Sequence, residues 1–282
     1  MLNALTVDVE DWYHTHDLNI GEDRWDSLED RIERSTATIL ELFSRHGVRA
    51  TFFILGHVAG RHPGLVREIA GAGHEIGCHG DMHRMVCRQT REEFRADLLK
   101  SRQLLEDISG AGVRVYRAPS WSISPDSLWA LEVLEEEGFV CDSSLQPFKT
   151  PLSGISGAPV APYHPVIGGR RLKLLEFPPT VLQLGGLRLP FAGGLYLRAL
   201  PFWVIKGALS RVNLQRPGLI YVHPWELDPG QPRIKTSAVV RITHYLKLGG
   251  TRDKIAELIK HFSFTVLGDF PGMGDYPDLP VV

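Results

Sequence analysis

Two histidines separated by three residues are the feature of this chain that most directly indicates chemistry. His79 and His83 follow a short, apolar, strand-like run. Neutral imidazole is the commonest protein ligand for zinc, and two residues four positions apart on one helical turn can point the same way. A catalytic metal site usually needs a third protein ligand and a position open to water. The pair therefore predicts a divalent-metal site that requires an acid from elsewhere in the chain.

Acidic residues that could complete such a site stand at the end of a β-prone run near the N-terminus. Asp8, Glu10 and Asp11 close this run. A carboxylate in a buried strand is costly unless it is paired or bound to a metal, so Asp8 needs a partner. It could pair with a buried arginine, for which Arg117 is the candidate, and it could be a catalytic base. Both explanations can hold together.

Other residues of metal-binding type are expected to have different roles. His14 and His16 lie in an aromatic loop, where we expect them to be exposed and to face a substrate. The chain has three cysteines, an odd count that lacks the spacing of a disulfide scaffold or a zinc ribbon and so indicates a reducing compartment. Cys78 adjoins His79, but neighbours on an extended segment point to opposite faces. We therefore expect Cys78 to pack in the core.

The composition is that of an ordinary soluble globular protein. The 282 residues are 43% hydrophobic and 23% charged, which suffices for one sizeable core. The net charge of −2 gives no bias toward nucleic acid, and no nucleic-acid partner is expected. The N-terminus lacks the basic and apolar regions of a signal peptide, and no apolar run reaches the roughly 18 residues that span a bilayer. We therefore expect a cytoplasmic protein without a transmembrane segment.

The elements that must position these residues alternate between strands and helices. The predicted strands cover residues 5–9, 49–56, 74–78, 113–122, 139–144 and 218–225. The predicted helices cover residues 28–46, with Gly47 as the C-cap, 63–72, 90–110, 124–138 and 251–261. Short connections between strands and helices imply parallel strands, whose C-terminal ends collect functional residues. The rhythm favours a single α/β barrel-like domain over residues 1–282.

Residues 146–218 differ from the rest because they are dense in Pro and Gly, and we treat them as an insertion in the single domain. Strands at 172–177 and 182–189 and an apolar helix within 195–212, starting near Pro201, are expected. If exposed, this stretch would form an apolar patch that serves as a lid, a dimer contact or a lipid-facing surface, although burial in the core is favoured. Peripheral contact with a membrane or with a lipid-linked substrate, and homo-oligomerisation, therefore remain open.

Five motifs fall at predicted strand ends and together resemble a known family. In chain order they are Asp8-Val9-Glu10-Asp11, His79 to His83, Arg117-Ala118-Pro119, Asp142-Ser143-Ser144 and His223. This series resembles the polysaccharide deacetylases of carbohydrate esterase family four over residues 4–145 and 215–262. The opening 8–12 and the segment 244–246 are similar to the exopolysaccharide-locus branch. The resemblance implies a distorted (β/α)7 barrel and metal-dependent hydrolysis of an N-acetyl group on an amino sugar, in a polysaccharide or its lipid-linked precursor.

The resemblance also implies roles for individual residues. His79 and His83 would bind a divalent metal, for which zinc is expected, while Arg117 would position the base and His223 would protonate the leaving amine. The first motif departs from the family's two adjacent aspartates. One alignment makes Glu10 the base and Asp11 the ligand, and the other makes Asp8 the base and Glu10 the ligand. Asp8 is favoured as the base, while Glu10 and Asp11 both stay candidates for the third ligand.

The predicted groups meet the chemical needs of a hydrolase that acts on carbon–nitrogen bonds other than peptide bonds. Amide hydrolysis needs a nucleophilic water, a cation that polarises the carbonyl and a proton for the departing nitrogen. Residues expected to contact the carbohydrate at the barrel mouth are Trp12, Pro119, Trp121 and Trp225. Two alternatives stay open, namely hydrolysis of a cyclic amide or ureide on the same fold and a non-catalytic carbohydrate-binding relative.

Overall fold

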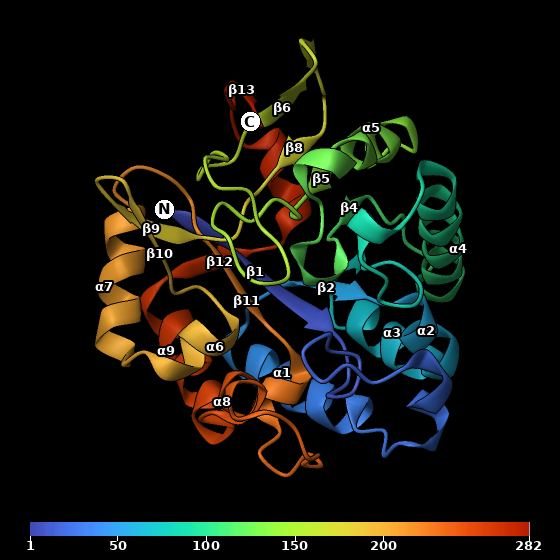
Figure 1. Ribbon diagram of the computed structural model, residues 1–282. Coiled ribbons are helices and arrows are strands. Elements are labelled where there is room, and N and C mark those ends of the chain that lie inside the picture. The colour runs from blue at the N-terminus through green and yellow to red at the C-terminus, as the bar shows by residue number, and fades with distance from the viewer. Residues whose placement is uncertain (282) are drawn as a thin grey trace.

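The computed structural model describes residues 1–281, and its largest element is one parallel sheet (Figure 1). Its strands lie side by side in the order β11 (Leu219–Val222), β1 (Leu2–Val9), β2 (Thr51–Ile54), β3 (Glu75–Cys78), β4 (Val115–Tyr116), β5 (Cys141–Asp142) and β8 (Leu175–Glu176). A further strand, β12 (Ser263–Thr265), pairs with the first residues of β1. Because every pairing in this sheet is parallel, all carboxyl ends of its strands lie at one edge. This is the α/β architecture of the distorted (β/α)7 barrel that the sequence predicts.

Helices connect the strands and cover the sheet (Figure 1). They are α1 (Ile32–His46), α2 (Gly56–Arg61), α3 (Pro63–Gly71), α4 (Arg91–Ser109), α5 (Trp129–Glu136), α6 (Gly194–Ala199), α7 (Phe202–Val212), α8 (Ala238–Tyr245) and α9 (Thr251–His261). Short 3-10 turns lie at Glu22–Ser27, Val86–Arg88, Pro119–Trp121, Pro125–Ser127, Pro224–Leu227, Leu248–Gly250 and Leu267–Gly272. Within residues 1–281, none of the helices is both long enough and apolar enough to cross a membrane.

Local sequence signals account for the helix ends. Gly47 ends α1 with a left-handed φ of 61°, as its position in the sequence predicts. Thr90 caps α4 by accepting a hydrogen bond from the Glu93 backbone, and the Glu93 side chain accepts one from the Thr90 backbone. α2 was not expected from the sequence, because its six residues are too few to show a helical period.

The central strand β1 explains why the site forms where it does. It pairs with β11 on one side and with β12 and β2 on the other, and every residue from Asn3 to Val9 is buried. Near-continuous apolar sequence is what a parallel strand covered on both faces requires. Asp8 is the charged exception within the strand, so the sheet carries a carboxylate into the interior at its carboxyl edge.

The segment 146–218 is more divided than the sequence suggests. It contributes β8 to the main sheet, and β6 (His164–Ile167) and β7 (Arg170–Arg171) form a small sheet with β13 (Asp278–Pro280). The expected strand at 182–189 is a hairpin of β9 (Val181–Leu184) and β10 (Leu187–Pro190), because Gly185 turns the chain with a φ of 59°. The apolar helix expected to start near Pro201 is α7, and a separate short helix, α6, precedes Pro201. The description of this segment as an insertion in one domain stays a prediction.

Candidate active site

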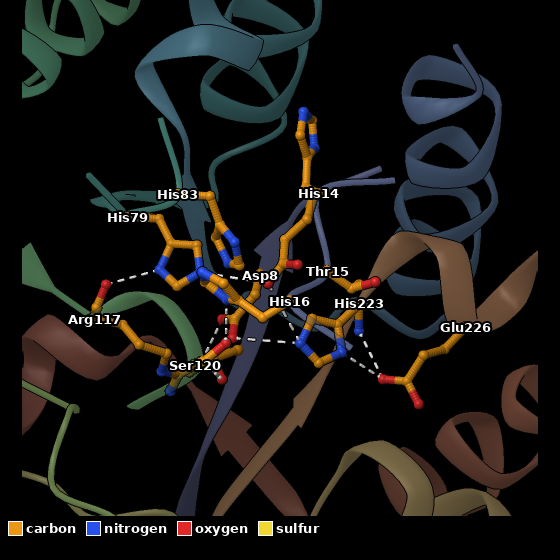
Figure 2. Close-up of polar contacts among 12 residues, drawn as sticks. Asp8, His14, Thr15, His16, His79, His83, Arg117, Ser120, His223 and Glu226 are labelled. Carbon is orange, nitrogen blue, oxygen red and sulfur yellow. Dashed lines mark hydrogen bonds and ion pairs between the residues drawn. The ribbon is translucent and has the colours of Figure 1, made fainter. Parts of the chain in front are cut away.

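The end of β1 places two carboxylates on one side of the sheet edge. Asp8 and Glu10 are two residues apart in an extended segment, so their side chains point the same way. Both are buried, with exposed fractions of 1% and 4%. Their oxygens lie close to the Nε2 atom of His223, at 3.7 Å for Asp8 and 3.6 Å for Glu10. The two acids therefore share one buried polar pocket with His223, and Figure 2 shows Asp8 beside this histidine.

Arg117 is the buried arginine that the sequence proposes as the partner of Asp8. It follows β4, is fully buried, and donates from Nη1 to the Asp8 carboxylate and to Thr6. Its Nη2 donates to the Ser143 hydroxyl at 3.1 Å, and its Nε donates to the Ser143 carbonyl at 3.3 Å. These bonds fix the guanidinium, so one Asp8 oxygen is held and the other faces His223.

His79 and His83 come together through a loop rather than through a helical turn. The expectation of one helical turn is wrong, because residues 79–83 have no helical structure and both Gly80 and His83 have positive φ, at 77° and 53°. The amides of Gly56 and His57 at the start of α2 bind the carbonyls of Gly80 and Asp81, each at 2.9 Å. The backbone carbonyls of the loop are therefore bound by the N-terminus of α2 and not by amides of a helical turn within the loop.

Glu10, His79 and His83 form a group that fits a metal ion. One ligand atom from each lies within 4.8 Å of the others, and the Glu10 oxygen is 3.4 Å from His79 Nε2 and 3.3 Å from His83 Nε2. His79 Nδ1 donates to the Arg117 carbonyl at 2.7 Å, which leaves Nε2 free to face Glu10. Neither His79 Nε2 nor either ring nitrogen of His83 has a hydrogen-bond partner among residues 1–281, although all three are buried. Buried ring nitrogens that make no hydrogen bond can serve as ligands for a metal ion.

The structure does not bring Asp11 into this group. Its two oxygens accept hydrogen bonds from the backbone amides of Trp12 and Arg31, at 2.7 and 2.6 Å. Burial raises the pKa of this carboxyl to about 7. The Asp11 amide donates to His14 Nδ1 at 2.9 Å. Of the two acids that the sequence leaves open as third ligand, Glu10 is the one that lies beside the histidines.

The two histidines of the aromatic loop differ in position. The expectation that His14 is exposed is wrong, since it is buried and points away from the two carboxylates (Figure 2). His16 lines the cleft, stacks on His83 with ring centres 4.6 Å apart, and shares a 2.8 Å hydrogen bond with Ser120. Cys78 is buried in the core, as expected.

His223 belongs to a buried chain of polar residues that the sequence did not predict. Its Nδ1 lies 2.6 Å from Glu226, and the other Glu226 oxygen accepts from Arg198 Nε at 2.7 Å. Burial lowers the pKa of His223, but the carboxylates of Glu10, Glu226 and Asp8 outweigh it and raise that pKa to about 9. His223 is therefore protonated near neutral pH, with Nε2 directed at the two acids. The spacing of Glu226 three residues after His223 is the signal that could have revealed this pair.

A cleft of about 460 Å³ opens above these residues. Trp121 and Trp225 line it, as expected, whereas Trp12 and Pro119 do not. Trp12 is 1% exposed and donates to the Glu29 carbonyl, and Pro119 is buried, so the prediction that these two contact a substrate is wrong. The other lining residues are Asp8, Glu10, Thr15, His16, Asp17, His83, Ser120, Gln146, Thr150, Pro151, Leu152, Ser153, His223, Val239, Val240 and Thr243.

A second pair of carboxyls is buried nearby, at the ends of β5 and β8. Asp142 and Glu176 face each other in the sheet register, and neither is exposed. Within residues 1–281, one oxygen of each has no hydrogen-bond partner. Burial raises the pKa of Asp142 to about 6 and the pKa of Glu176 well above its usual range. The pair therefore retains a proton at pH values where exposed carboxyls have lost theirs.

Comparison with known families divides the chain into two matched parts. Residues 22–138 match a family model described as polysaccharide deacetylase, and residues 143–270 match one described as a domain of unknown function (DUF3473). The first match contains His79, His83 and Arg117, and the second contains His223. The predicted homology to polysaccharide deacetylases is confirmed for the first part, while the exopolysaccharide-locus branch stays a prediction.

Individual relatives agree with this assignment. The chain is 35% identical over 98 residues to a peptidoglycan-N-acetylglucosamine deacetylase of Bacillus cereus, and 33% identical over 128 residues to a peptidoglycan deacetylase of Helicobacter pylori. These matches cover 34% and 44% of this chain. They cover 36% and 43% of the two relatives, so the chain spans less than half of the relatives' length. A crystal structure from Mycobacterium smegmatis, named provisionally as a polysaccharide deacetylase, superposes with a TM-score of 0.65 at 21% identity over 96% of this chain and 88% of that one. The fold prediction is thereby confirmed.

The geometry of the ligand group predicts which substitutions would weaken the binding of a divalent metal such as zinc. Glu10→Gln, His79→Ala and His83→Ala should each weaken zinc affinity by more than the roughly 10–100-fold that follows loss of a supporting residue. Asp11→Asn should leave zinc affinity unchanged, because both Asp11 oxygens are bound to backbone amides. Titration calorimetry with zinc on each metal-free variant measures this. Retained affinity in Glu10→Gln together with lost affinity in Asp11→Asn would contradict the geometry.

The buried Asp142–Glu176 pair predicts a stability that falls with pH. Because the pKa values of the two carboxyls are raised in the folded protein, the unfolded chain releases these protons at lower pH. The contribution of the protonated pair to the free energy of unfolding is therefore complete below about pH 4 and declines as the pH rises through the folded pKa values. Between about pH 5 and 8, the unfolding free energy of Glu176→Gln should fall less than that of wild type. Urea unfolding of both proteins at several pH values tests this, and parallel pH curves would refute it.

Proposed function

We propose that this chain hydrolyses the N-acetyl group of an amino sugar in a polysaccharide or its lipid-linked precursor, with a bound divalent metal. The observation that carries the proposal is one buried pocket holding the Glu10, His79 and His83 group next to Asp8 and His223. That pocket opens into a cleft with two tryptophans in its wall. Each part has a counterpart in the chemistry of amide hydrolysis.

Zinc is the metal that we propose for the Glu10, His79 and His83 group. Two imidazoles and one carboxylate are a ligand set used by catalytic zinc, which keeps a further position open. When bound, the ion supplies a Lewis acid that polarises the acetyl carbonyl. His79 is oriented for this role by its hydrogen bond to the Arg117 carbonyl.

Asp8 is the proposed general base. Arg117 donates to one oxygen of this carboxylate and also to the Thr6 hydroxyl, so the arginine side chain fixes Asp8 while its second oxygen faces the cleft. From there it can take a proton from a water that attacks the acetyl carbon. Arg117 does not line the cleft, so we assign it a positioning role rather than contact with substrate.

His223 is the proposed general acid. It is protonated near neutral pH because carboxylates surround it, and Nε2 faces the position where Asp8 and Glu10 meet. A proton from Nε2 neutralises the departing nitrogen as the carbon–nitrogen bond breaks, which yields acetate and a free amine. Glu226 then holds the ring through Nδ1 and keeps the reactive nitrogen aimed at the pocket.

The cleft favours a neutral carbohydrate over a polyanion. Among the described residues that line it, none is lysine or arginine, whereas three are acids. Trp225 is held between His223 and His244, with ring centres 5.2 and 4.4 Å away, so its indole is fixed before a sugar arrives. Both faces of the Trp225 indole are covered by these imidazoles, so this residue can offer a sugar the edge of its ring. The sequence features at 8–12 and 244–246 support the finer placement in the exopolysaccharide-locus branch.

Acetate release tests the proposed reaction. The zinc-loaded protein should release acetate from N-acetylglucosamine oligomers and should leave cyclic ureides intact. Asp8→Asn and His223→Ala should reduce kcat by on the order of 10²–10⁴-fold while zinc affinity persists. Hydrolysis of ureides without acetate release would favour the alternative hydrolase, and full turnover by His223→Ala would remove this residue from the mechanism.

The Glu226 contact predicts a change in the pH profile of the reaction. Glu226 raises the pKa of His223, so Glu226→Gln should lower that pKa and move the alkaline decline of kcat to lower pH. Glu226→Asp, which keeps the charge, should restore most of the shift. A fall in kcat with an unmoved alkaline limb would show that Glu226 acts only through folding, which thermal unfolding of both variants checks.

A further inference from the structure

Residues 177–225 contain no acidic residue, although the chain has 33. The basic residues of this stretch are Arg188, Arg198, Lys206, Arg211 and Arg216. The stretch includes the β9–β10 hairpin and α7, which lie side by side at the left edge of the molecule in Figure 1. An exposed surface with basic residues and no acidic residue favours an anionic partner.

This edge also carries large apolar side chains that are more than half exposed. Trp203 at the start of α7 is 75% exposed, and Leu214 just after its end is 71% exposed. Leu184 and Leu187, on either side of the Gly185–Gly186 turn, are 53% and 58% exposed. We define these four residues together with Lys206 and Arg211 as the hairpin–helix face.

The members of this face belong to one surface. Trp203 and Lys206 are three residues apart on α7, so they are neighbours on its surface, and Leu214 lies in the turn that follows the helix. The hairpin packs against α7, and Arg216 donates to the Val181 carbonyl at 2.8 Å, which ties the end of the helix to the first hairpin strand. The aromatic, basic and aliphatic groups therefore share one edge.

Two of the basic residues are free to bind an anion. Arg198 is buried against Glu226, and Arg188 donates to the carbonyls of Pro147 and Ala158. Lys206 and Arg211 form no ion pair within residues 1–281. An acid close to Lys206 is Glu257 on α9, and it is paired with Lys260 at 2.7 Å.

We propose that the hairpin–helix face binds the surface of a bilayer that contains anionic phospholipid. Tryptophan suits the boundary between headgroups and acyl chains, and exposed leucines gain free energy by entering it. Lysine and arginine beside them contact lipid phosphates. A second copy of the chain is a poorer occupant, because a symmetric contact would place Lys206 and Arg211 against their own copies. The proposal does not depend on the catalytic residues.

Vesicle sedimentation tests this binding with the full-length chain. Wild type should sediment with phosphatidylcholine vesicles that contain 30% phosphatidylglycerol, about tenfold more weakly with phosphatidylcholine alone, and more weakly again at high salt. Trp203→Ser and the double variant Lys206→Glu/Arg211→Glu should each lose about tenfold in partition. Matched controls are Leu99→Ser, an exposed apolar residue on α4, and Arg67→Glu/Arg114→Glu, which should bind like wild type.

Three outcomes would overturn the proposal. The first is wild type that stays in the supernatant with anionic vesicles at low salt. The second is equal loss of binding in the test and control variants, which would indicate general electrostatic attraction. The third is a change of mass in light scattering for Trp203→Ser, which would assign the face to self-association. Acetate release from a soluble oligomer should be the same in all these variants, so a failure here is separate from a failure of the proposed reaction.

Discussion

The burial of two carboxylates at the end of the central strand is the constraint on which the rest of the site depends. An ionised carboxylate in the interior is strongly unfavourable unless charged or hydrogen-bonding partners surround it. Arg117 donates a hydrogen bond to the Asp8 carboxylate, and three imidazoles lie beside the Glu10 carboxylate. The groups that stabilise the buried carboxylates also have the proton donors, acceptors and ligand atoms that amide hydrolysis needs.

The site draws on both halves of the chain. The part that matches polysaccharide deacetylases supplies His79, His83 and Arg117, whereas His223 and its support by Glu226 and Arg198 come from the part matched to a domain of unknown function. The wall of the cleft also takes residues from the later part, including Gln146, Leu152 and Val239. We therefore propose that the second part supplies the general acid and part of the cleft wall.

Much of this arrangement could be predicted, because parallel strands bring their carboxyl ends to one edge. The alternation of strands and helices therefore suffices to predict that Asp8, His79, Arg117 and His223 meet. What the sequence could not decide depends on side-chain direction. Glu10 and Asp11 both carry a carboxylate, so the sequence cannot tell which one is the ligand. The structure can, because backbone amides bind both oxygens of Asp11. Trp12 and Trp121 are the same residue type and both are buried, and only the folded structure shows that Trp121 lines the cleft and Trp12 does not. The helical turn predicted for 79–83 failed because contacts with α2, distant in sequence, override local spacing.

Anomalous X-ray diffraction at the zinc absorption edge, from crystals grown with zinc, tests the central claim most directly. The account predicts one strong peak at about 2.0–2.2 Å from Nε2 of His79, Nε2 of His83 and a carboxylate oxygen of Glu10. A peak bound by Asp11 in place of Glu10, or no peak at this position in zinc-saturated crystals, would contradict it.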